Sequence, residues 1–395
     1  MKISTTNKKQ IEELLTRSIN EVINPTHLKQ ALLSNKKLRI KFGIDPTSPN
    51  IHFGRAVPLL KLKDFQQLGH QIVFIIGDFT GVIGDTSDKE TERPMLSKKE
   101  VEKNMETYIA QIEKILDVKK TEIHYNSKWL TKLRYAEIGR QTDQFSLAEF
   151  INRENIKKRL TKGTRVSLRE VLYPLMQGYD SVAIKADVEI GGTDQRFNLL
   201  AGRALQVYYK QQPQDILMVN LISGTDGKKM SSSRGNTINL TDKPNDMFGK
   251  IMSLSDDLMI SYFLHCTRIP IEKVEEYNEQ LRKNKVNPRN IKMKLAHEIT
   301  KIYWGEKKAA ETQNFFINVF QKKNIPNKIQ KMKLANKNII EILIQSKLAK
   351  SKSEARKLIN QKGIKVDNKI VESSEKIIKS GSIIQKGKRY FIKII

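Results

Sequence analysis

The sequence is poor in cysteine, in tryptophan and in long apolar runs. Cys266 is the only cysteine among 395 residues, which excludes a secreted scaffold held by disulfides. No apolar stretch approaches the roughly 18 residues of a membrane-spanning helix, and the first 25 residues do not have the pattern of a signal peptide. The six histidines are scattered, which argues against a structural zinc site. These absences predict a cytoplasmic protein without a membrane partner or a tightly bound metal.

Acidic residues are scarce relative to basic ones. The chain has 71 Lys and Arg against 43 Asp and Glu, a formal net charge of +28. More than half of this excess lies in residues 321–395, which hold 20 basic and 5 acidic residues. Clustered positive charge favours a nucleic-acid partner, although drift in a chain rich in Lys, Ile and Asn explains the same numbers. The length and the 38% of hydrophobic residues indicate two or three domains with a core.

The hydrophobic pattern predicts an α/β fold with a parallel sheet. We expect helices over 8–33 and 52–68, and strands over 38–44 and 71–76. An apolar run of strand length is typical of a strand covered on both faces, and a strand, a helix and a strand within 40 residues form a βαβ unit. Further helices are expected over 99–117, 134–160, 167–179 and 193–209, and further strands over 182–190 and 216–222.

The second half of the chain changes character twice. Residues 243–320 are predicted to be helical, and the basic stretch 321–337 to be a linker. Beyond it, the sequence predicts a helix over 339–344, a helix over 352–361 that begins at a Ser-x-x-Glu capping box, and two strand pairs within 364–395. The predicted domains are therefore 1–225 around the parallel sheet, 226–320 with the helices, and a small α+β domain over 338–395.

Two motifs lie on loops that follow predicted strands. The first, residues 42–55, contains His-Phe-Gly-Arg at 52–55. In an open parallel sheet, ligands bind where strands end and helices begin, and helix N-termini attract phosphate. The second, residues 226–236, contains Lys-Met-Ser-Ser-Ser at 229–233, whose ammonium and hydroxyl groups suit a triphosphate. Taken alone, either pattern also occurs in ordinary solvated loops.

A third pattern lies in residues 173–195. Tyr173, Gln177 and Asp180 are spaced i, i+4 and i+7, so they share one face of the predicted helix. A phenol, an amide and a carboxylate can bind the ammonium of an amino acid at one end and a hydroxyl group at the other. The polar outer face of an ordinary helix has the same spacing, so this pattern alone leaves both interpretations open.

Together these motifs resemble the class I aminoacyl-tRNA synthetases. Residues 52–55 resemble the HIGH motif of that class, and residues 229–233 resemble its KMSKS motif. The stretches similar to bacterial tyrosyl-tRNA synthetases are 76–85, 173–180 and 186–195. Residues 351–363 resemble the S4 RNA-binding module that ends those enzymes. The resemblance covers nearly the whole chain, and it implies a Rossmann-like catalytic domain, an α-helical domain on the anticodon side and a small S4-like domain.

The resemblance also implies a role for each matching residue. Around the substrate tyrosine it places Asp85, Tyr173 and Gln177 at the ammonium and Asp180 at the phenol. Around ATP it places Gly43, Asp45, Thr47, His52, Gly54, Arg55, Gly192, Asp194, Gln195, Lys229, Met230, Ser231, Ser232 and Ser233. The implied catalytic residues are His52, Thr47, Lys229, Lys89 and Arg93, although the charges of Lys89 and Arg93 fit a solvated loop equally well. The expected tRNA contacts are Lys350, Lys352, Arg356 and Lys357.

The implied reaction has two steps. L-tyrosine and ATP give tyrosyl-adenylate and pyrophosphate, and the tyrosine is then transferred to the 3′-terminal ribose of tRNA(Tyr) with release of AMP. Mg²⁺ accompanies ATP in such a reaction, and the sequence shows no protein cage for it. The resemblance further implies a homodimer. Discrimination against phenylalanine is expected from the buried group that pairs with the phenol.

Three positions depart from the family pattern. Arg55 replaces the second His of HIGH, Ser232 replaces the second Lys of KMSKS, and Lys41 stands where many relatives place a tyrosine against the substrate phenol. Two alternatives therefore stay open: a catalytically silent RNA-binding paralogue, and a small-molecule adenylyltransferase that does not use tRNA. The complete set of pocket residues argues against the first alternative, and the basic C-terminal segment argues against the second.

Overall fold

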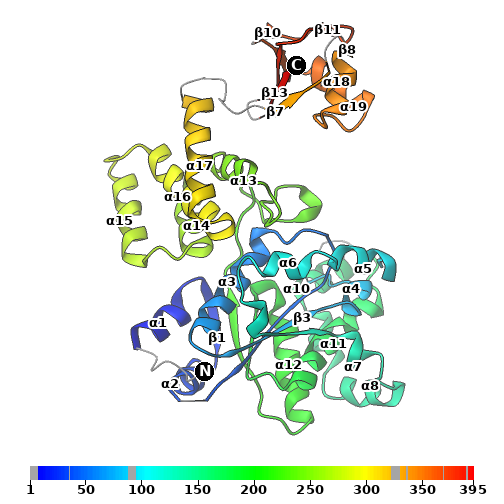
Figure 1. The fold of residues 1–395 in the computed structure, drawn as a ribbon. Coiled ribbons are helices and arrows are strands. Elements are labelled where there is room, and N and C mark those ends of the chain that lie inside the picture. Colours follow the sequence, from blue (N-terminus) through cyan, green and yellow to red (C-terminus); the bar gives the residue numbers. More distant parts are fainter. Residues whose placement is uncertain are drawn as a thin grey trace. The chain divides into compact units, whose positions relative to one another are not determined.

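The computed structural model describes residues 8–34, 36–87, 95–321, 330–334, 337–367, 369–387 and 390–395 (Figure 1). The chain divides into two compact units, 1–242 with 251–303 and 243–250 with 304–395. Among the described residues, no helix combines the length and the apolar character needed to cross a membrane. The domain boundaries expected from the sequence remain a prediction.

The first unit is built on a six-stranded sheet with the order β1-β6-β5-β2-β3-β4. Its strands are β1 (Ile19–Ile23), β2 (Arg39–Ile44), β3 (Gln71–Ile76), β4 (Thr121–Tyr125), β5 (Val188–Gly192) and β6 (Asp215–Val219). The strands from β6 to β4 run parallel, and β1 pairs antiparallel with β6 at one edge. The predicted α/β fold with a parallel sheet is confirmed.

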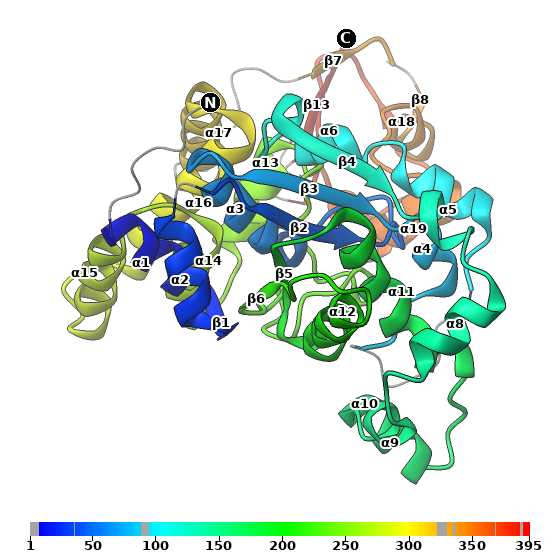
Figure 2. The ribbon, with the colours of Figure 1, turned by 90° about the horizontal axis from the view of Figure 1, so that it is seen from below.

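The strand order reverses between β2 and β5. From β2 the chain passes through α3 (Phe53–Gln67) to β3 on one side, and from β5 it passes through α12 (Arg196–Tyr208) to β6 on the other side. Right-handed crossovers in opposite directions place these two helices on opposite faces of the sheet, as Figure 2 shows. Such a reversal opens a crevice at the carboxyl ends of the two strands. All three predicted motifs flank this point.

Several helices differ from the sequence prediction. The expected helix 8–33 is wrong, because α1 (Lys8–Thr16) and α2 (Pro25–Leu33) are separated by β1. Ser18 and Asn24 adopt positive φ on either side of β1, which ends the helical path. Pairing with β6, about 200 residues away in the sequence, decides the conformation of β1.

Two further predicted helices are divided. The range 99–117 contains α5 (Lys98–Met105) and α6 (Tyr108–Ile112). The range 134–160 contains α8 (Tyr135–Thr142), α9 (Leu147–Ile151) and α10 (Glu154–Thr161). Ser146 begins α9 with a complete capping box, a start signal inside the expected single helix. Two short helices lie outside these ranges, α4 (Thr80–Ile83) after β3 and α7 (Ser127–Leu130) after β4.

Helix α11 (Leu168–Ile184) carries the third motif and is longer than expected. It runs into the range expected as strand 182–190, where the strand begins only at Val188. A complete capping box of Ser167 and Glu170 begins the helix. A Cβ on Gly178 would lie 3.0 Å from the Gly202 nitrogen, so this glycine lets α11 and α12 pack closely.

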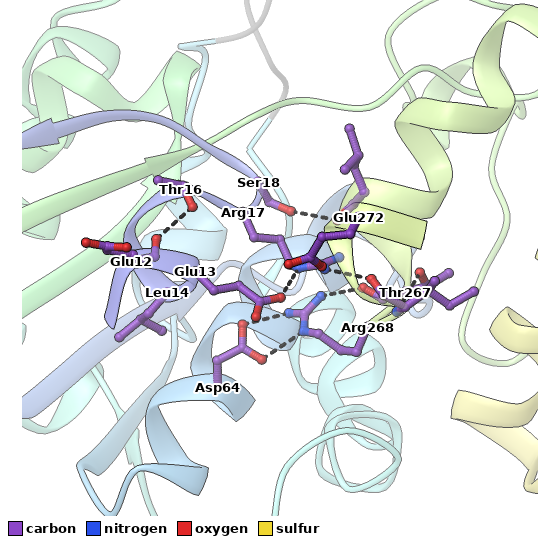
Figure 3. A network of polar contacts seen from close by, with 12 residues as sticks. Glu12, Glu13, Leu14, Thr16, Arg17, Ser18, Asp64, Thr267, Arg268 and Glu272 are labelled. Carbon is purple, nitrogen blue, oxygen red and sulfur yellow. Dashed lines mark hydrogen bonds and ion pairs between the residues drawn. The ribbon is translucent and has the colours of Figure 1, made fainter. Parts of the chain in front are cut away.

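Residues 243–320 are helical, as predicted, but divided into α13 (Pro244–Met252), α14 (Met259–Cys266), α15 (Ile271–Arg282), α16 (Pro288–Trp304) and α17 (Glu306–Phe316). A polar network joins the α14–α15 turn to α1 and α3 within the first unit (Figure 3). Arg268 binds Asp64 through two hydrogen bonds of 2.8 and 3.0 Å. Arg17 binds Glu13 at 2.7 Å and donates to the Ile269 carbonyl. Because Asp64 lies on α3, these contacts fix α14 and α15 against the sheet domain.

The C-terminal module contains a five-stranded sheet in the order β10-β9-β12-β13-β7 and the pair β11–β8. Its strands are β7 (Gln330–Met332), β8 (Lys337–Asn338), β9 (Ile364–Val366), β10 (Lys369–Ile370), β11 (Ile377–Ile378), β12 (Ile383–Lys386) and β13 (Tyr390–Ile394). Helices α18 (Ile339–Gln345) and α19 (Lys352–Asn360) pack on it through buried Ile and Ala side chains. The α+β prediction for the module is confirmed.

Two details of the module differ from the prediction. The range 321–337 is not only a linker, because β7 pairs parallel with β13. The capping box of α19 is half formed: Ser351 accepts from the Glu354 nitrogen at 3.2 Å. The Glu354 carboxylate accepts instead from the Lys350 nitrogen at 2.7 Å.

Candidate active site

A cavity of about 740 Å³ lies at the carboxyl ends of β2, β5 and β6. Its walls include every described residue that the sequence analysis assigned to ATP or to tyrosine. These are Gly43, Asp45, Thr47, His52, Gly54, Arg55, Asp85, Tyr173, Gln177, Asp180, Gly192, Asp194, Gln195, Lys229, Met230, Ser231, Ser232 and Ser233. Lys89 and Arg93 lie outside the described residues. The three motifs, far apart in the sequence, therefore share one cavity.

The first two motifs touch directly. The chain that leaves the second motif runs beside the first, with the Phe53 nitrogen donating to the Ile238 carbonyl at 2.9 Å. The Gly54 nitrogen donates to the Met230 sulfur at 3.3 Å. A Cβ on Gly54 would lie 3.0 Å from the His52 ring, so only glycine fits here without a shift of that ring. The contact places the start of α3 and the 229–233 loop on the same wall.

The 226–236 loop has an ordered shape. Asn236 closes it, because its amide donates to Asp226 at 2.7 Å and accepts from the Ser231 nitrogen at 2.9 Å. Lys229 then reaches across to Asp194, with 2.9 Å between the ammonium and the carboxylate. This ion pair places the cation of the second motif beside the turn that follows β5. A phosphate chain bound at this wall would therefore lie within reach of a lysine.

Arg55, the departure from HIGH, braces the loop that follows β2. Its guanidinium donates to the Asp45 carbonyl at 2.9 Å and to the Thr47 hydroxyl at 3.2 Å. Arg55 also lines the cavity, so a cation remains at this position. The resemblance placed Arg55 around ATP, but the sequence did not predict that Arg55 holds Thr47.

Asp45 and Tyr173 form a hydrogen-bonded pair at the end of β2. The Tyr173 hydroxyl donates to Asp45 at 2.8 Å, and Thr80 donates to the other oxygen at 2.6 Å. Burial raises the pKa of Asp45 to about 6 despite these two donors, which lower it. A Cβ on Gly77 would lie 2.1 Å from Asp45, so the glycine after β3 is required for this arrangement.

Asp180 lies deeper and is 5% exposed. It accepts from the Trp129 indole at 2.7 Å and from the Asn126 amide at 3.2 Å. Burial raises the pKa of Asp180 to about 7, and the nearby Lys41 charge is the largest effect that lowers it. In its ionised form this carboxylate can accept a hydrogen bond from a hydroxyl group in the cavity. The sequence analysis did not identify Asn126 or Trp129, which follow β4 without a motif of their own.

The remaining polar wall is a chain of side-chain amides. Gln195 donates to Asp85 at 2.7 Å, and Asn198 donates to both Gln195 and Gln177, at 2.9 and 3.1 Å. Asn198 is buried on α12 and was not predicted from the sequence. The chain orients Asp85 and Gln177 toward the same end of the cavity, where a carboxylate and amide oxygens suit a cationic group.

The predicted tRNA contacts lie apart from these residues in sequence. Lys350, Lys352, Arg356 and Lys357 are exposed on or just before α19 in the C-terminal module. Their role stays a prediction. In the part of the chain that the structure describes, no three His, Cys, Asp or Glu side chains are grouped to hold a metal ion.

Comparison with known proteins agrees with this geometry. Residues 33–321 match the family described as tRNA synthetases class I (W and Y), and residues 340–384 match the S4 domain. The chain is 43% identical to the tyrosine–tRNA ligase of Thermotoga maritima, over 97% of this chain and 96% of that one. It is 44% identical to tyrosine–tRNA ligase 2 of Clostridium acetobutylicum, over 98% and 99%.

Solved structures with the same fold have lower identity. A truncated mitochondrial tyrosyl-tRNA synthetase of Aspergillus nidulans covers 80% of this chain and 95% of its own, with a TM-score of 0.67 and 21% identity. The tyrosyl-tRNA synthetase of Archaeoglobus fulgidus, solved with L-tyrosine, covers 77% and 99%, with a TM-score of 0.61 and 20% identity. The parallel sheet, the cavity and the sequence relatives lead to one conclusion: this chain belongs to the class I tRNA synthetases of the tryptophan and tyrosine family and ends in an S4 domain.

Proposed function

We propose that this chain is an active tyrosine–tRNA ligase that activates L-tyrosine with ATP and transfers it to tRNA(Tyr). The observation that carries the proposal is the two-ended cavity. Asp180, with its two hydrogen-bond donors, marks one end, and the Asp85–Gln195–Asn198–Gln177 amide chain marks the other. A zwitterionic amino acid with a distal hydroxyl group matches both ends. The tyrosine–tRNA ligases at 43% and 44% identity support the same substrate.

Activation needs little covalent work from the protein. The tyrosine carboxylate attacks the α-phosphorus of ATP in line, a new P–O bond forms, and pyrophosphate leaves with the electron pair of the broken P–O bond. Catalysis then consists of positioning the two substrates and stabilising negative charge on the phosphates. Asp85, Tyr173 and Gln177 would hold the ammonium, and Asp180 would accept the phenol hydrogen bond. The carboxylate, which is bonded to the same Cα as the ammonium, would then lie at the ammonium end, where it would meet the α-phosphorus of ATP.

ATP would bind along the wall where the first two motifs meet. His52, Gly54 and the N-terminus of α3 suit the phosphates, and Lys229 adds an ammonium charge. Thr47 would present its hydroxyl with Arg55 behind it. Gly192, Asp194 and Gln195 would take the ribose and adenine side, and Met230 with Ser231, Ser232 and Ser233 would close the loop. Lys89 and Arg93 would act at the pyrophosphate.

Mg²⁺ would arrive as part of the substrate, bound to the phosphates of ATP. It supplies charge neutralisation on the phosphates, and it usually keeps several waters in such complexes. The carboxylates in the cavity have other partners: Asp45 accepts from Tyr173 and Thr80, and Asp194 pairs with Lys229. No step of this proposal depends on a metal held by the protein alone.

Transfer to tRNA would use the same cavity. The 3′-terminal ribose hydroxyl attacks the carbonyl carbon of the adenylate, AMP leaves, and tyrosine becomes esterified to the ribose. Lys350, Lys352, Arg356 and Lys357 would bind phosphates of the tRNA. A cytoplasmic homodimer is part of the proposal, and exposed apolar side chains on the α8–α11 segment support the dimer: Tyr135, Leu147, Leu160 and Leu168.

The decisive test is amino-acid-dependent exchange of pyrophosphate into ATP without tRNA, compared for tyrosine, tryptophan and phenylalanine. We expect exchange with tyrosine alone, followed by aminoacylation when tRNA(Tyr) is added. No exchange with any amino acid, by folded protein that binds tRNA, would identify the silent RNA-binding paralogue. Exchange without transfer to tRNA would instead favour the adenylyltransferase that does not use tRNA.

A further inference from the structure

Two opposite charges are buried beneath the phenol end of the cavity. Lys41 on β2 and Glu189 on β5 are register partners on neighbouring strands. Their ammonium and carboxylate are 2.8 Å apart, and their side chains are 1% and 2% exposed. A buried ion pair contributes little net stability, because desolvation offsets the attraction. Two apolar residues would fill the same place in these strands, so the pair needs another explanation.

The pair forms hydrogen bonds with helix α11 on both sides of Asp180. Lys41 donates to the Gln177 carbonyl at 2.9 Å and to the Ser181 hydroxyl at 2.7 Å. Glu189 accepts from the Gln177 amide at 3.3 Å and from Ser181 at 3.0 Å. Gln177 precedes Asp180 by three residues, and Ser181 follows it directly. These contacts fix the position of α11 along and around its own axis at Asp180, whose carboxylate faces the cavity.

The charged groups of the pair each have several partners: the Lys41 ammonium binds Gln177, Ser181 and Glu189, and both Glu189 oxygens accept hydrogen bonds. One Glu189 oxygen faces Lys41 and Gln177, and the other accepts from Ser181 and Gln214. A Cβ on Gly202 would lie 3.1 Å from the Ser181 hydroxyl, so α12 presents a glycine to the cluster. A buried ion pair whose two charged groups are both hydrogen-bonded favours one geometry over several. An apolar contact would allow α11 to slide or rotate.

The cluster also acts electrostatically on Asp180. Lys41 is the principal nearby charge that favours the ionised carboxylate, whereas Glu189 opposes it. Trp129 and Asn126 face Asp180 from outside α11 and donate hydrogen bonds to it. On α11 itself, Tyr173 lies close enough to interact with the charge of Asp180. Lys41 and Glu189 both line the cavity, but their polar atoms bind α11, Gln214 and each other.

We propose that Lys41 and Glu189 form a positioning pair that sets the preference for tyrosine over phenylalanine, by holding α11 so that Asp180 reads the substrate phenol. The proposal rests on the proposed function. Lys41 would act through α11, without contact to the substrate.

The test compares Lys41→Met, Glu189→Gln and the double variant. Lys41→Met leaves Glu189 charged and unpaired, so we expect both the melting temperature and tyrosine activation to fall. The double variant removes both charges, so its melting temperature should recover. Its KM for tyrosine should stay raised by roughly ten-fold, and its preference for tyrosine over phenylalanine should stay lowered by a similar factor. The KM for ATP should change little, because the pair does not touch the ATP wall.

A matched control lies on the same helix. Arg159 and Glu170 form a second buried ion pair, with Glu170 in the first turn of α11 and neither residue in the cavity wall. Arg159→Met with Glu170→Gln also removes both charges of a buried pair, and it should change neither the KM for tyrosine nor the preference for tyrosine over phenylalanine. Glu189→Gln alone keeps the shape of the side chain and should show the loss of preference in a milder form, even if Lys41→Met does not fold.

The outcomes separate the two proposals. Wild-type protein without tyrosine-dependent exchange would overturn the proposed function itself. Tyrosine exchange in the wild type, together with a double variant that recovers KM and preference along with its melting temperature, would show that the pair is only structural and would overturn this inference. An equal loss of preference in the Arg159 and Glu170 control would overturn it as well.

Discussion

Helices α11 and α19 begin with the same signal, a serine followed three residues later by a glutamate, yet they use charge in opposite ways. Helix α11 turns Glu170 and Asp180 into the interior, where Arg159 pairs with the first, and Trp129 and Asn126 bind the second. Helix α19 leaves its cations exposed. The local sequence sets where each helix starts. The surroundings of each helix set what its charges do.

The difference indicates that the two helices serve the recognition of two different substrates, the amino acid and the RNA. A buried carboxylate with fixed donors discriminates at short range, because an unsatisfied buried group costs a large part of the binding energy. Exposed lysines act at longer range and weaken as salt screens them. We therefore expect the first unit to choose the amino acid and the C-terminal module to add affinity for RNA. The predictions below test this division.

The largest effect is expected for Asp180→Ala. Removal of the carboxylate leaves the substrate phenol without its buried acceptor, at a cost of about 3 kcal/mol, or roughly 100-fold in kcat/KM for tyrosine. Phenylalanine has no hydroxyl group to lose, so the preference between the two amino acids should largely disappear. Pyrophosphate exchange with each amino acid measures this. An unchanged preference for tyrosine would remove Asp180 from the role of phenol reader.

The four cations of the α19 region should contribute to tRNA affinity and not to activation. Replacement of Lys350, Lys352, Arg356 and Lys357 by Gln should weaken tRNA binding by about ten-fold or more at low salt and reduce the slope of log K against log salt. Binding titrations at several salt concentrations measure both. Tyrosine-dependent exchange should stay at the wild-type level.

A matched control for this variant uses four other exposed lysines of the same module, Lys331, Lys369, Lys376 and Lys379. Their replacement by Gln lowers the net charge equally but leaves α19 intact. If both variants lose the same affinity, general charge and not the α19 surface binds the RNA, and the assignment of these contacts is wrong.

The buried carboxylates also predict how stability depends on pH. The pKa of Asp180 is about 7 and that of Asp45 about 6, both above the ordinary value of 3.8. Between about pH 4 and 7 each of these two carboxyls holds more protons in the folded state than in the unfolded chain, so their contribution to the free energy of unfolding should fall as pH rises. Burial lowers the pKa of His70 and of His265 to about 4, and these two groups contribute in the opposite direction up to about pH 6.5. The slope is on the order of 1 kcal/mol per pH unit for each group.

Denaturant unfolding of the wild type and of Asp180→Asn across this pH window isolates one of the two groups. The amide does not titrate, so the stability of the variant relative to the wild type should rise as pH rises toward 7. The difference between the two curves gives the contribution of Asp180, because Asp45, His70 and His265 contribute equally to both proteins. Parallel curves for the two proteins would mean that Asp180 does not hold a proton in the folded state.

The smallest effects are expected at the two helix caps. Loss of an N-cap hydroxyl costs about 1 kcal/mol. Ser167→Ala should cost more than Ser351→Ala, because the α11 capping box is complete and the α19 box is half formed. Hydrogen exchange of peptides that cover each helix resolves them separately. Faster exchange in α19 than in α11 after the matched substitutions would contradict this order.

The sequence predicted most of the elements that have strong local signals. Strand β3 is an apolar run, α3 is rich in apolar residues that are buried, and α19 begins at a capping serine, so each is visible within a short window. Strand β1 was missed because its five residues continue the helical spacing of α1. Only its pairing with β6 makes it a strand. The breaks between helices at Ser146 and within 99–117 were also missed. In these stretches several short helices were predicted as one long helix.

The site shows the same division. The resemblance of the motifs to a known family, and not their spacing alone, named the described substrate residues, and these residues line the cavity. Asn126, Trp129 and Asn198 were missed because they support the motif residues from other elements and follow no spacing of their own. Arg55 was assigned to phosphate, whereas its contacts with Asp45 and Thr47 depend on how the loop folds back.

The sequence by itself determined the α/β class, the C-terminal basic module and the family, because apolar periodicity, charge and motifs are local properties of a chain. Only the tertiary structure decided which charges meet. Lys41 and Glu189 are 148 positions apart, and each lies in a short strand whose other residues are mostly apolar or glycine. The parallel pairing of β2 with β5 places them side by side beneath Asp180. Burial then turns two ordinary charges into one pair, because neither can leave water without the other.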